Sequence, residues 1–237
     1  MTPQIGVTIL ANIRNEAETR ELYKKIFTAA TALFMQKGFE KTTLMDIAKQ
    51  SGVSKRVIIY EMNSKEEILG HLVTKFLDGV TEASNSVATK LTDDKLLIVM
   101  ANEVLQIYMA EMSEDMRNLY LAGYSMPKTS EAVLKRRSTM LYEKFKDVFP
   151  DFKLKDFYEL EIASMGIMRA YMSVPCDMYF TLEAKRERLI STMLKIYDVD
   201  GERIKQVNEF TEKIDFETVA KKAVEGVFNE LEIKTNK

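Results

Sequence analysis

Apolar residues recur at intervals of three and four along most of the chain, which is the spacing of one face of an α-helix. This spacing predicts a first helix around residues 22–34, and Gly38 follows it in the position that a left-handed C-cap favours. Two short helices are predicted next, over residues 44–50 and 55–62. A capping-box pattern at residues 64–67 then opens a long helix, so the chain begins with four predicted helices.

The same periodicity continues towards the C-terminus. It predicts helices over residues 96–112, 114–124, 129–148, 155–174, 181–197, 202–213 and 216–231. Thr92 or Asp93 is the candidate N-cap of the first of these. Nine glycines and four prolines are too few for the turns of an all-β fold, so we predict an all-α fold. Residues 1–15 fit either a frayed arm or an extension of the first helix, and residues 234–237 are expected to fray.

Residues 43–62 have the turn chemistry of a helix-turn-helix unit. Ala48 is small enough for the second of the two short helices to pack across the first, and Gly52 supplies a positive φ between them. This geometry would direct residues 55–60 towards the major groove of DNA. From periodicity alone, a plain three-helix bundle with solvated lysines fits equally well.

Charge is unevenly distributed along the chain. The formal net charge is −2, yet residues 37–65 hold six Lys/Arg and three Asp/Glu, a local net of +3 that leaves −5 for the rest. A small basic module on an acidic body suits a protein that contacts phosphates, although a mixed solvated surface has the same composition. With 46% apolar and 30% charged residues, the chain can bury a sizeable core.

Three observations bear on compartment and chemistry. The single cysteine, Cys176, allows no internal disulfide, which fits a reducing cytoplasm, and we expect it to be a buried small side chain rather than a redox sensor. Residues 4–13 lack the flanks of a signal peptide, and no apolar run reaches the length of a membrane span. We therefore predict a cytoplasmic protein with no membrane partner.

Catalytic and metal-binding patterns are missing from the sequence. His71 is the only histidine and cannot build a metal site alone, so packing or a surface position is expected for it, with pH sensing as the other possibility. No phosphate loop, nucleophile elbow or metal-ligand spacing occurs. We predict that the protein is not an enzyme, has no catalytic residues and uses no metal or cofactor.

Three stretches, residues 26–43, 46–55 and 63–69, resemble the N-terminal domain of the tetracycline-repressor (TetR/AcrR) family without gaps. They cover about a fifth of the chain; the remainder is similar to the family only in being helical and of comparable size. The resemblance implies a helix-turn-helix DNA-binding domain at residues 1–66 and a helical ligand-sensing and dimerisation domain at residues 67–237. It also implies a homodimer that presents two recognition helices about 34–36 Å apart to a palindromic operator.

The resemblance also assigns DNA contacts by position. Arg56 and Val57 would read base edges, and Arg56 could fork onto guanine. The contacts to the phosphate backbone would come from Thr43, Lys55, Tyr60 and Lys65. The full predicted DNA-binding set is Thr43, Ser54, Lys55, Arg56, Val57, Ile59, Tyr60 and Lys65.

The chain departs from the family pattern in the second short helix. Arg56 stands where a small residue is usual, and the aromatic residue falls at Tyr60 instead of Ile59. Glu61 and Met62 stand where His and Phe are common. Since phosphates repel a carboxylate, Glu61 either faces away from DNA or accepts from a cytosine amine.

Methionine and tyrosine are frequent in the C-terminal part of the chain. At helical spacing most of them are expected in the core, but Met repacks easily and Tyr brings a polar tip, so several are candidates for an effector pocket. The candidates are Tyr108, Met112, Tyr120, Tyr124, Met140, Met165 and Met168.

Gly166 lies within a predicted helix, where glycine costs about 1 kcal/mol relative to alanine. A close approach of two helices would justify it. The family forms its dimer through a four-helix bundle, which the resemblance assigns here to Ala163, Gly166, Ile167 and Ala170, with residues 181–197 as the second helix. A tight crossing within one chain explains Gly166 equally well.

These observations predict a ligand-responsive transcriptional regulator, more often a repressor than an activator. Its partners would be double-stranded DNA, a second copy of the chain and a small apolar effector. The long helix that begins at Ser64 would connect the effector-binding part of the chain to the DNA-binding part. Two other classes stay open. One is a helical protein-interaction adaptor that no longer reads DNA, suggested by Glu61; the other is an enzyme on a helical scaffold, for which catalytic groups are missing.

Overall fold

The computed structural model describes residues 16–230 and confirms the all-α fold. Within this range the chain forms eleven helices and no strand. The helices are α1 (Glu16–Lys37), α2 (Leu44–Ser51), α3 (Lys55–Met62), α4 (Lys65–Ala88), α5 (Lys95–Glu111), α6 (Glu114–Ser125), α7 (Pro127–Phe145), α8 (Leu154–Ser173), α9 (Leu182–Ile196), α10 (Gly201–Thr211) and α11 (Phe216–Glu230). The predictions for residues 1–15 and 234–237 lie outside the described residues.

Side-chain caps define the N-terminal helices, as the sequence predicts. The Thr43 hydroxyl accepts from the backbone N–H of Asp46, and the Asp46 carboxylate accepts from the backbone N–H of Thr43. The Ser54 and Ser64 hydroxyls accept from the backbone N–H groups of Val57 and Glu67, but neither has the reciprocal side-chain bond, so the capping box predicted at residues 64–67 is only half formed. These bonds satisfy N–H groups that a helix start would otherwise leave without partners.

Three predicted boundaries, at the start of α5 and at both ends of α7, are wrong. The N-cap of α5 is Asp94, not Thr92 or Asp93, because its carboxylate accepts from two successive backbone N–H groups at the helix start. Helix α7 begins at Pro127, two residues earlier than predicted, since proline at the first helical position lacks only an N–H that the helix does not use. It also ends at Phe145, where the chain enters a turn.

Gly52 gives a first testable prediction. Its φ of 69° ends α2 in the left-handed region, which costs L-residues with a side chain about 1–2 kcal/mol. Gly52→Ala should therefore lower the free energy of unfolding in urea by that amount, although nothing lies within 4 Å of the added Cβ. Gly226→Ala, in equally open space inside α11, is the control and should be stabilising by up to about 1 kcal/mol. Equal stability of Gly52→Ala and the unmodified chain would contradict a strained cap.

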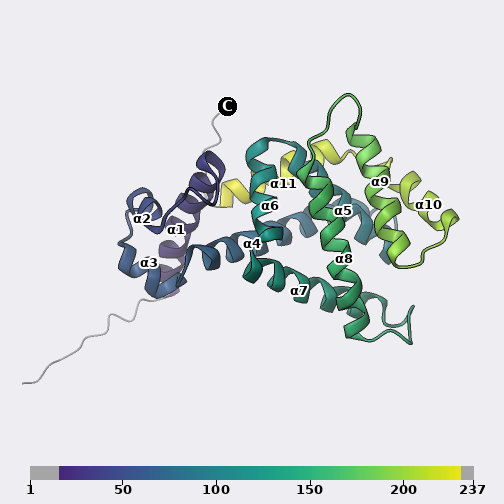
Figure 1. Ribbon diagram of the computed structural model, residues 1–237, viewed down its shortest axis with the longest axis horizontal. Helices are drawn as coiled ribbons and strands as arrows, with labels where there is room; N and C mark the ends of the chain where they lie inside the picture. The colour runs from purple at the N-terminus through teal and green to yellow at the C-terminus, as the bar shows by residue number, and fades with distance from the viewer. Residues whose placement is uncertain (1–15, 231–237) are drawn as a thin grey trace, which may run out of the picture.

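Helix α4 connects the N-terminal three-helix unit to the larger helical body (Figure 1). The unit of α1–α3 lies at one end of the molecule, and α1 also packs against α6. Two glycines allow close approaches along α4. A Cβ at Gly123 of α6 would lie 2.7 Å from Val73 Cγ2, and a Cβ at Gly79 would lie 2.9 Å from Val227 Cγ2 of α11. Movements of α4 therefore have to be shared with α6 and α11.

One contiguous cluster of buried apolar side chains runs from α1 to α11. The predicted domain boundary, between residues 66 and 67, falls in the first turn of α4, and the division into two domains stays a prediction. His71 is exposed on α4 with its ring 5.9 Å from that of Phe27. None of the described helices combines the length and the apolar character that crossing a membrane would need.

Candidate nucleic-acid interface and interior cavity

Helix α3 has one buried and one exposed face. Ile58 and Met62 are 0% and 3% exposed and anchor it to the core. The opposite face presents polar, basic and large apolar side chains to solvent: Ser54, Lys55, Arg56, Ile59 and Tyr60. Tyr60 is 86% exposed, an unusual position for an aromatic side chain that has no partner to cover it. Val57 lies between the two faces and packs against the core.

The turn that precedes α2 is held by two of the predicted phosphate-binding residues. Thr43 donates both its N–H and its hydroxyl to Asp46, at 2.8 and 2.7 Å. Lys37 completes this cluster at 2.7 Å from Asp46, and Lys37 and Thr43 together hold the pKa of Asp46 well below its usual range. The Lys65 ammonium donates to the carbonyl oxygen of Phe39 at 2.7 Å and lies 4.0 Å from the centre of its ring. Both residues thus already have internal partners.

Glu61 points towards α1. Its Oε2 atom accepts from the Tyr23 hydroxyl at 3.1 Å. Of the two orientations left open by the sequence, the structure therefore has the one in which the carboxylate is turned away from the exposed face of α3. The exposed positions of α3 itself carry two cations and no carboxylate.

The helical body contains a partly open cavity of about 530 Å³, a volume typical of small-molecule sites. Helices α5, α7, α8 and α9 form it, together with the connection between α7 and α8 and the segment from the end of α9 into α10. Its apolar lining consists of Leu96, Val99, Met100, Leu141, Phe145, Val148, Phe149, Phe157, Met193, Leu194 and Val199. At the rim, Arg203 forms an ion pair with Asp94 and so ties α10 to the start of α5.

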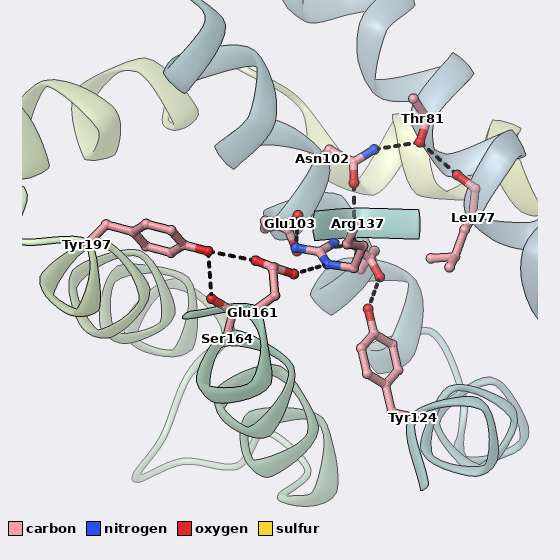
Figure 2. Close-up of polar contacts among 10 residues, drawn as sticks. Leu77, Thr81, Asn102, Glu103, Tyr124, Arg137, Glu161, Ser164 and Tyr197 are labelled. Atoms are coloured by element: carbon pink, nitrogen blue, oxygen red, sulfur yellow. Dashed lines mark hydrogen bonds and ion pairs between the residues drawn. The ribbon is translucent and has the colours of Figure 1, made fainter. Parts of the chain in front are cut away.

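A buried charge cluster forms the polar floor of this cavity (Figure 2). The Arg137 guanidinium contacts Glu103 Oε1 at 2.8 Å and donates from Nε to Glu161 Oε2 at 2.6 Å. The exposed fractions of these side chains are 9%, 2% and 1%. Burial disfavours the charged guanidinium, but the two carboxylates outweigh it and raise the pKa of Arg137, which stays a cation. Burial raises the pKa of Glu103, Glu161 acts in the same direction and Arg137 opposes both.

Hydrogen bonds extend from this floor to α4 and α9. Tyr197 donates to Glu161 Oε1 at 2.8 Å (Figure 2). On the other side, the Gln106 amide donates to Glu103 Oε2 and to Asn102 Oδ1, both at 3.3 Å. The Asn102 amide in turn donates to Thr81 of α4 at 3.2 Å. The cavity floor is thus connected by side-chain bonds to the helix that carries α1–α3.

A second buried charge cluster lies outside the cavity. Glu111 pairs with Lys185 at 2.6 Å and with Arg117 at 3.0 Å, and it accepts from the backbone N–H of Cys176 at 3.1 Å. This cluster fastens the segment between α8 and α9. Burial raises the pKa of the Cys176 thiol, which disfavours the reactive thiolate. Among residues 16–230, no three His, Cys, Asp or Glu side chains are grouped so that they could hold a metal ion.

Comparison with known proteins places the exposed α3 face within a known DNA-binding domain. The family pattern "Bacterial regulatory proteins, tetR family" matches residues 26–72, which span most of α1, all of α2 and α3, and the start of α4. Over these residues the chain is similar to the tetR family. This family consists of transcriptional regulators and not of enzymes, in agreement with the sequence prediction.

Curated relatives match over the same part of the chain. The probable HTH-type transcriptional regulator YttP of Bacillus subtilis (strain 168) is 35% identical over 77 residues, which are 31% of this chain and 37% of YttP. TtgR of Pseudomonas putida, an HTH-type transcriptional regulator, is 30% identical over 102 residues, 39% of this chain and 47% of TtgR. The chain therefore spans less than half the length of the relatives it matches.

A solved structure extends the likeness to the helical body. The crystal structure of a TetR-family transcriptional regulator from Pectobacterium atrosepticum superposes with a TM-score of 0.52, over 78% of this chain and 94% of that one. The sequence identity is 12%, so this likeness concerns the fold. It confirms the predicted combination of an N-terminal helix-turn-helix unit and a C-terminal helical region.

The helical body does not bring the seven predicted effector-binding residues together at the large cavity. Met140 lines a smaller cavity of about 100 Å³, which also borders Arg137 and Glu103. Met112 is 40% exposed, and Tyr108 stacks on Phe216 with ring centres 5.3 Å apart. The remaining four are buried in the core: Tyr120, Tyr124, Met165 and Met168.

The residues that do line the cavity floor were missed in the sequence. Glu103, Arg137 and Glu161 are charged residues at positions where helical periodicity places apolar ones, which is the signal that could have identified them. A charge at a buried position needs a partner, and three such positions on three helices indicate a shared site.

The four predicted dimer-seam residues share one face of α8. Ala163, Gly166 and Ala170 are exposed and Ile167 is half-buried. No described atom of another helix lies within 4 Å of a Cβ built on Gly166, so a tight crossing within one chain, the other explanation of this glycine, is wrong. Ile162, 56% exposed, continues this face with an apolar side chain.

Proposed function

We propose that this protein is a ligand-responsive transcriptional repressor that binds a palindromic DNA operator as a homodimer. The observation that carries the proposal is the exposed face of α3, which presents Lys55, Arg56 and Tyr60 while Ile58 and Met62 anchor the helix. A short helix held in this way inside a helix-turn-helix unit can enter the major groove. The family match over residues 26–72 supports this use of the helix.

Each exposed side chain of α3 has chemistry suited to a duplex. Arg56 can donate two bonds to the O6 and N7 atoms of guanine, while Lys55 and Ser54 can donate to phosphates. Tyr60 and Ile59 offer apolar surface to sugars and to thymine methyl groups. Thr43 and Lys65 set the turn before α2 through their internal bonds, and we propose that they contact phosphates from that position.

The orientation of Glu61 supports DNA binding over the adaptor alternative. That alternative rested on a carboxylate that phosphates would repel. Because Glu61 accepts from Tyr23, its charge is directed to α1, and the charged residues on the exposed face of α3 are cations.

Salt dependence tests the DNA-binding proposal. Fluorescence anisotropy of a labelled mixed-sequence duplex should show binding whose affinity falls by roughly 10³-fold or more between 50 and 200 mM salt. This loss reflects the counterions released when cations contact phosphates. The absence of binding in dilute salt would refute the proposal.

The exposed face of α8 supports the homodimer. Light scattering should give about twice the chain mass of 27.3 kDa. Gly166→Leu places a branched side chain in the proposed seam and should shift the protein towards the monomer, because overpacking a close helix contact costs about 1–3 kcal/mol. Gly226→Leu, at another helical glycine with open space, is the control and should leave the dimer intact. A dimer that tolerates Gly166→Leu would place the seam elsewhere.

The cavity and its bonds to α4 support ligand control. We propose that an effector enters the 530 Å³ cavity and repositions the floor around Arg137. Thr81 of α4 is bonded to this floor through Asn102 and Gln106, so a shift there changes the angle at which α4 carries α3. Coupling between two sites in such a protein is typically about 1–3 kcal/mol.

A further inference from the structure

The floor of the cavity carries more negative than positive charge. Two buried carboxylates, Glu103 and Glu161, share the single guanidinium of Arg137. The other polar groups that bond to them, from Tyr197 and Gln106, are neutral. Fully ionised, this cluster therefore has a net charge of −1, and a buried charge without compensation is costly.

Glu103 is held against Arg137 at the floor of the cavity. Its Oε1 atom lies 2.8 Å from Arg137 Nη2, and solvent does not reach this atom. Buried carboxylates are costly unless cations compensate their charge. A positively charged group that enters the cavity beside Glu103 and Glu161 would supply the missing charge.

The rim of the cavity also carries more carboxylates than cations. Asp94, Asp198 and Asp200 line it with Lys95 and Arg203, so five carboxylates and three cations border the cavity as a whole. Arg203 is occupied by Asp94, and the Lys95 ammonium donates to a backbone carbonyl of α7. An anion entering here would be repelled at the rim and would meet two carboxylates around Arg137.

The remaining side chains that line the cavity are apolar and favour a ligand with a large apolar portion. Phe145, Phe149 and Phe157 border the cavity together with aliphatic side chains of α5, α7 and α9. Aromatic faces also attract cations. We infer that the cavity binds an amphipathic organic cation, an aromatic or aliphatic body with a protonated amine that pairs with Glu103 and Glu161. This inference rests on the proposed function at one point: the bound cation is taken to be the effector of the regulator.

Binding of such a cation should be coupled to proton release. Glu103 interacts electrostatically with Arg137 of α7, Glu161 of α8, and Tyr120 and Tyr124 of α6. Because burial raises the pKa of Glu103, this carboxyl group keeps its proton to a higher pH than an exposed glutamate does. An ammonium ion would replace that proton, so its affinity should increase as the pH rises through the pKa of Glu103 and the carboxyl ionises.

Three ligands with one body and different charges test the inference. Isothermal titration calorimetry of the full chain with phenylbutylamine, phenylbutanol and phenylbutyrate should give an affinity at least about tenfold higher for the amine than for the alcohol, the gain expected of a charge-assisted hydrogen bond. Phenylbutyrate should be the weakest. Failure of the amine to bind, or an alcohol or carboxylate that binds as tightly, would overturn the inference.

Isosteric variants locate the site. Glu103→Gln and Glu161→Gln each leave Arg137 with one carboxylate, so both variants should fold and both should lose the preference for the amine over the alcohol. Glu131→Gln removes the same charge from the exposed surface of α7 and should keep the preference. An amine preference that survives in both cavity variants would place binding elsewhere and refute the assignment.

The outcome is separable from that of the proposed function. A chain that binds duplex DNA but shows no preference for the amine remains a DNA-binding protein with a different effector class. A chain that prefers the amine but ignores duplex DNA confirms the cavity assignment and refutes the regulator. Release of duplex by phenylbutylamine, abolished in Glu103→Gln, would connect the two.

Discussion

Replacing Arg137 by methionine should lower the free energy of unfolding by about 3–5 kcal/mol, as measured by urea denaturation. The substitution keeps much of the side-chain volume but leaves Glu103 and Glu161 buried without a cation. The loss should be smaller at low pH. Burial already raises the pKa of Glu103, and a carboxyl group with a raised pKa in the folded state contributes stability at low pH that is lost as the pH rises.

Two controls separate charge from packing. Arg136→Met removes a neighbouring guanidinium that pairs with Asp78 on the surface and should cost no more than about 1 kcal/mol. The triple variant that combines Arg137→Met with Glu103→Gln and Glu161→Gln has no buried charge at this site and should regain most of the lost stability. An Arg137→Met protein as stable as Arg136→Met would show that the cluster is not held together by charge.

The double variant Lys55→Ala/Arg56→Ala should lower the affinity for a specific duplex by at least about 100-fold. An arginine that contacts a base contributes about 1–3 kcal/mol to the free energy of DNA binding. The double variant removes this contact from both subunits of a dimer. Anisotropy titrations at several salt concentrations should also give a shallower dependence of affinity on salt, because the lost lysine contacts phosphate.

Lys221→Ala/Lys222→Ala is the matched control for this pair. These residues are also adjacent and exposed, but they lie on α11, away from α3. The control removes the same charge and should change the affinity little. If both double variants weakened binding equally, net charge rather than the face of α3 would account for it.

The helices and their caps could be predicted because local chemistry determines them. Thr43, Ser54 and Ser64 bond to backbone groups three residues away, and Gly38 and Gly52 adopt their positive φ within the adjoining turn. The exposed face of α3 follows from the same periodicity. Local rules failed at α5, where three successive residues could all serve as a cap and the third one does.

The cavity could not be predicted because residues far apart in sequence form it. Frequent methionine and tyrosine residues indicate adaptable packing but not its location, and those singled out lie mainly in the core. Charged residues at positions that helical periodicity predicts to be buried are a better indicator of where the cavity lies. Glu103 follows Met100 and precedes Ile107 on one face of α5, and Arg137 and Glu161 occupy comparable positions. Only the tertiary fold shows that these three side chains meet.

Selection of duplexes from a random-sequence pool tests the central claim most directly, because it asks whether two copies of α3 read DNA together. The account predicts enrichment of sequences with two inverted half-sites whose centres are about 10 base pairs apart, one turn of the double helix. Lys55→Ala/Arg56→Ala should not enrich them. Recovery of a single half-site, or no enrichment in dilute salt, would contradict the account.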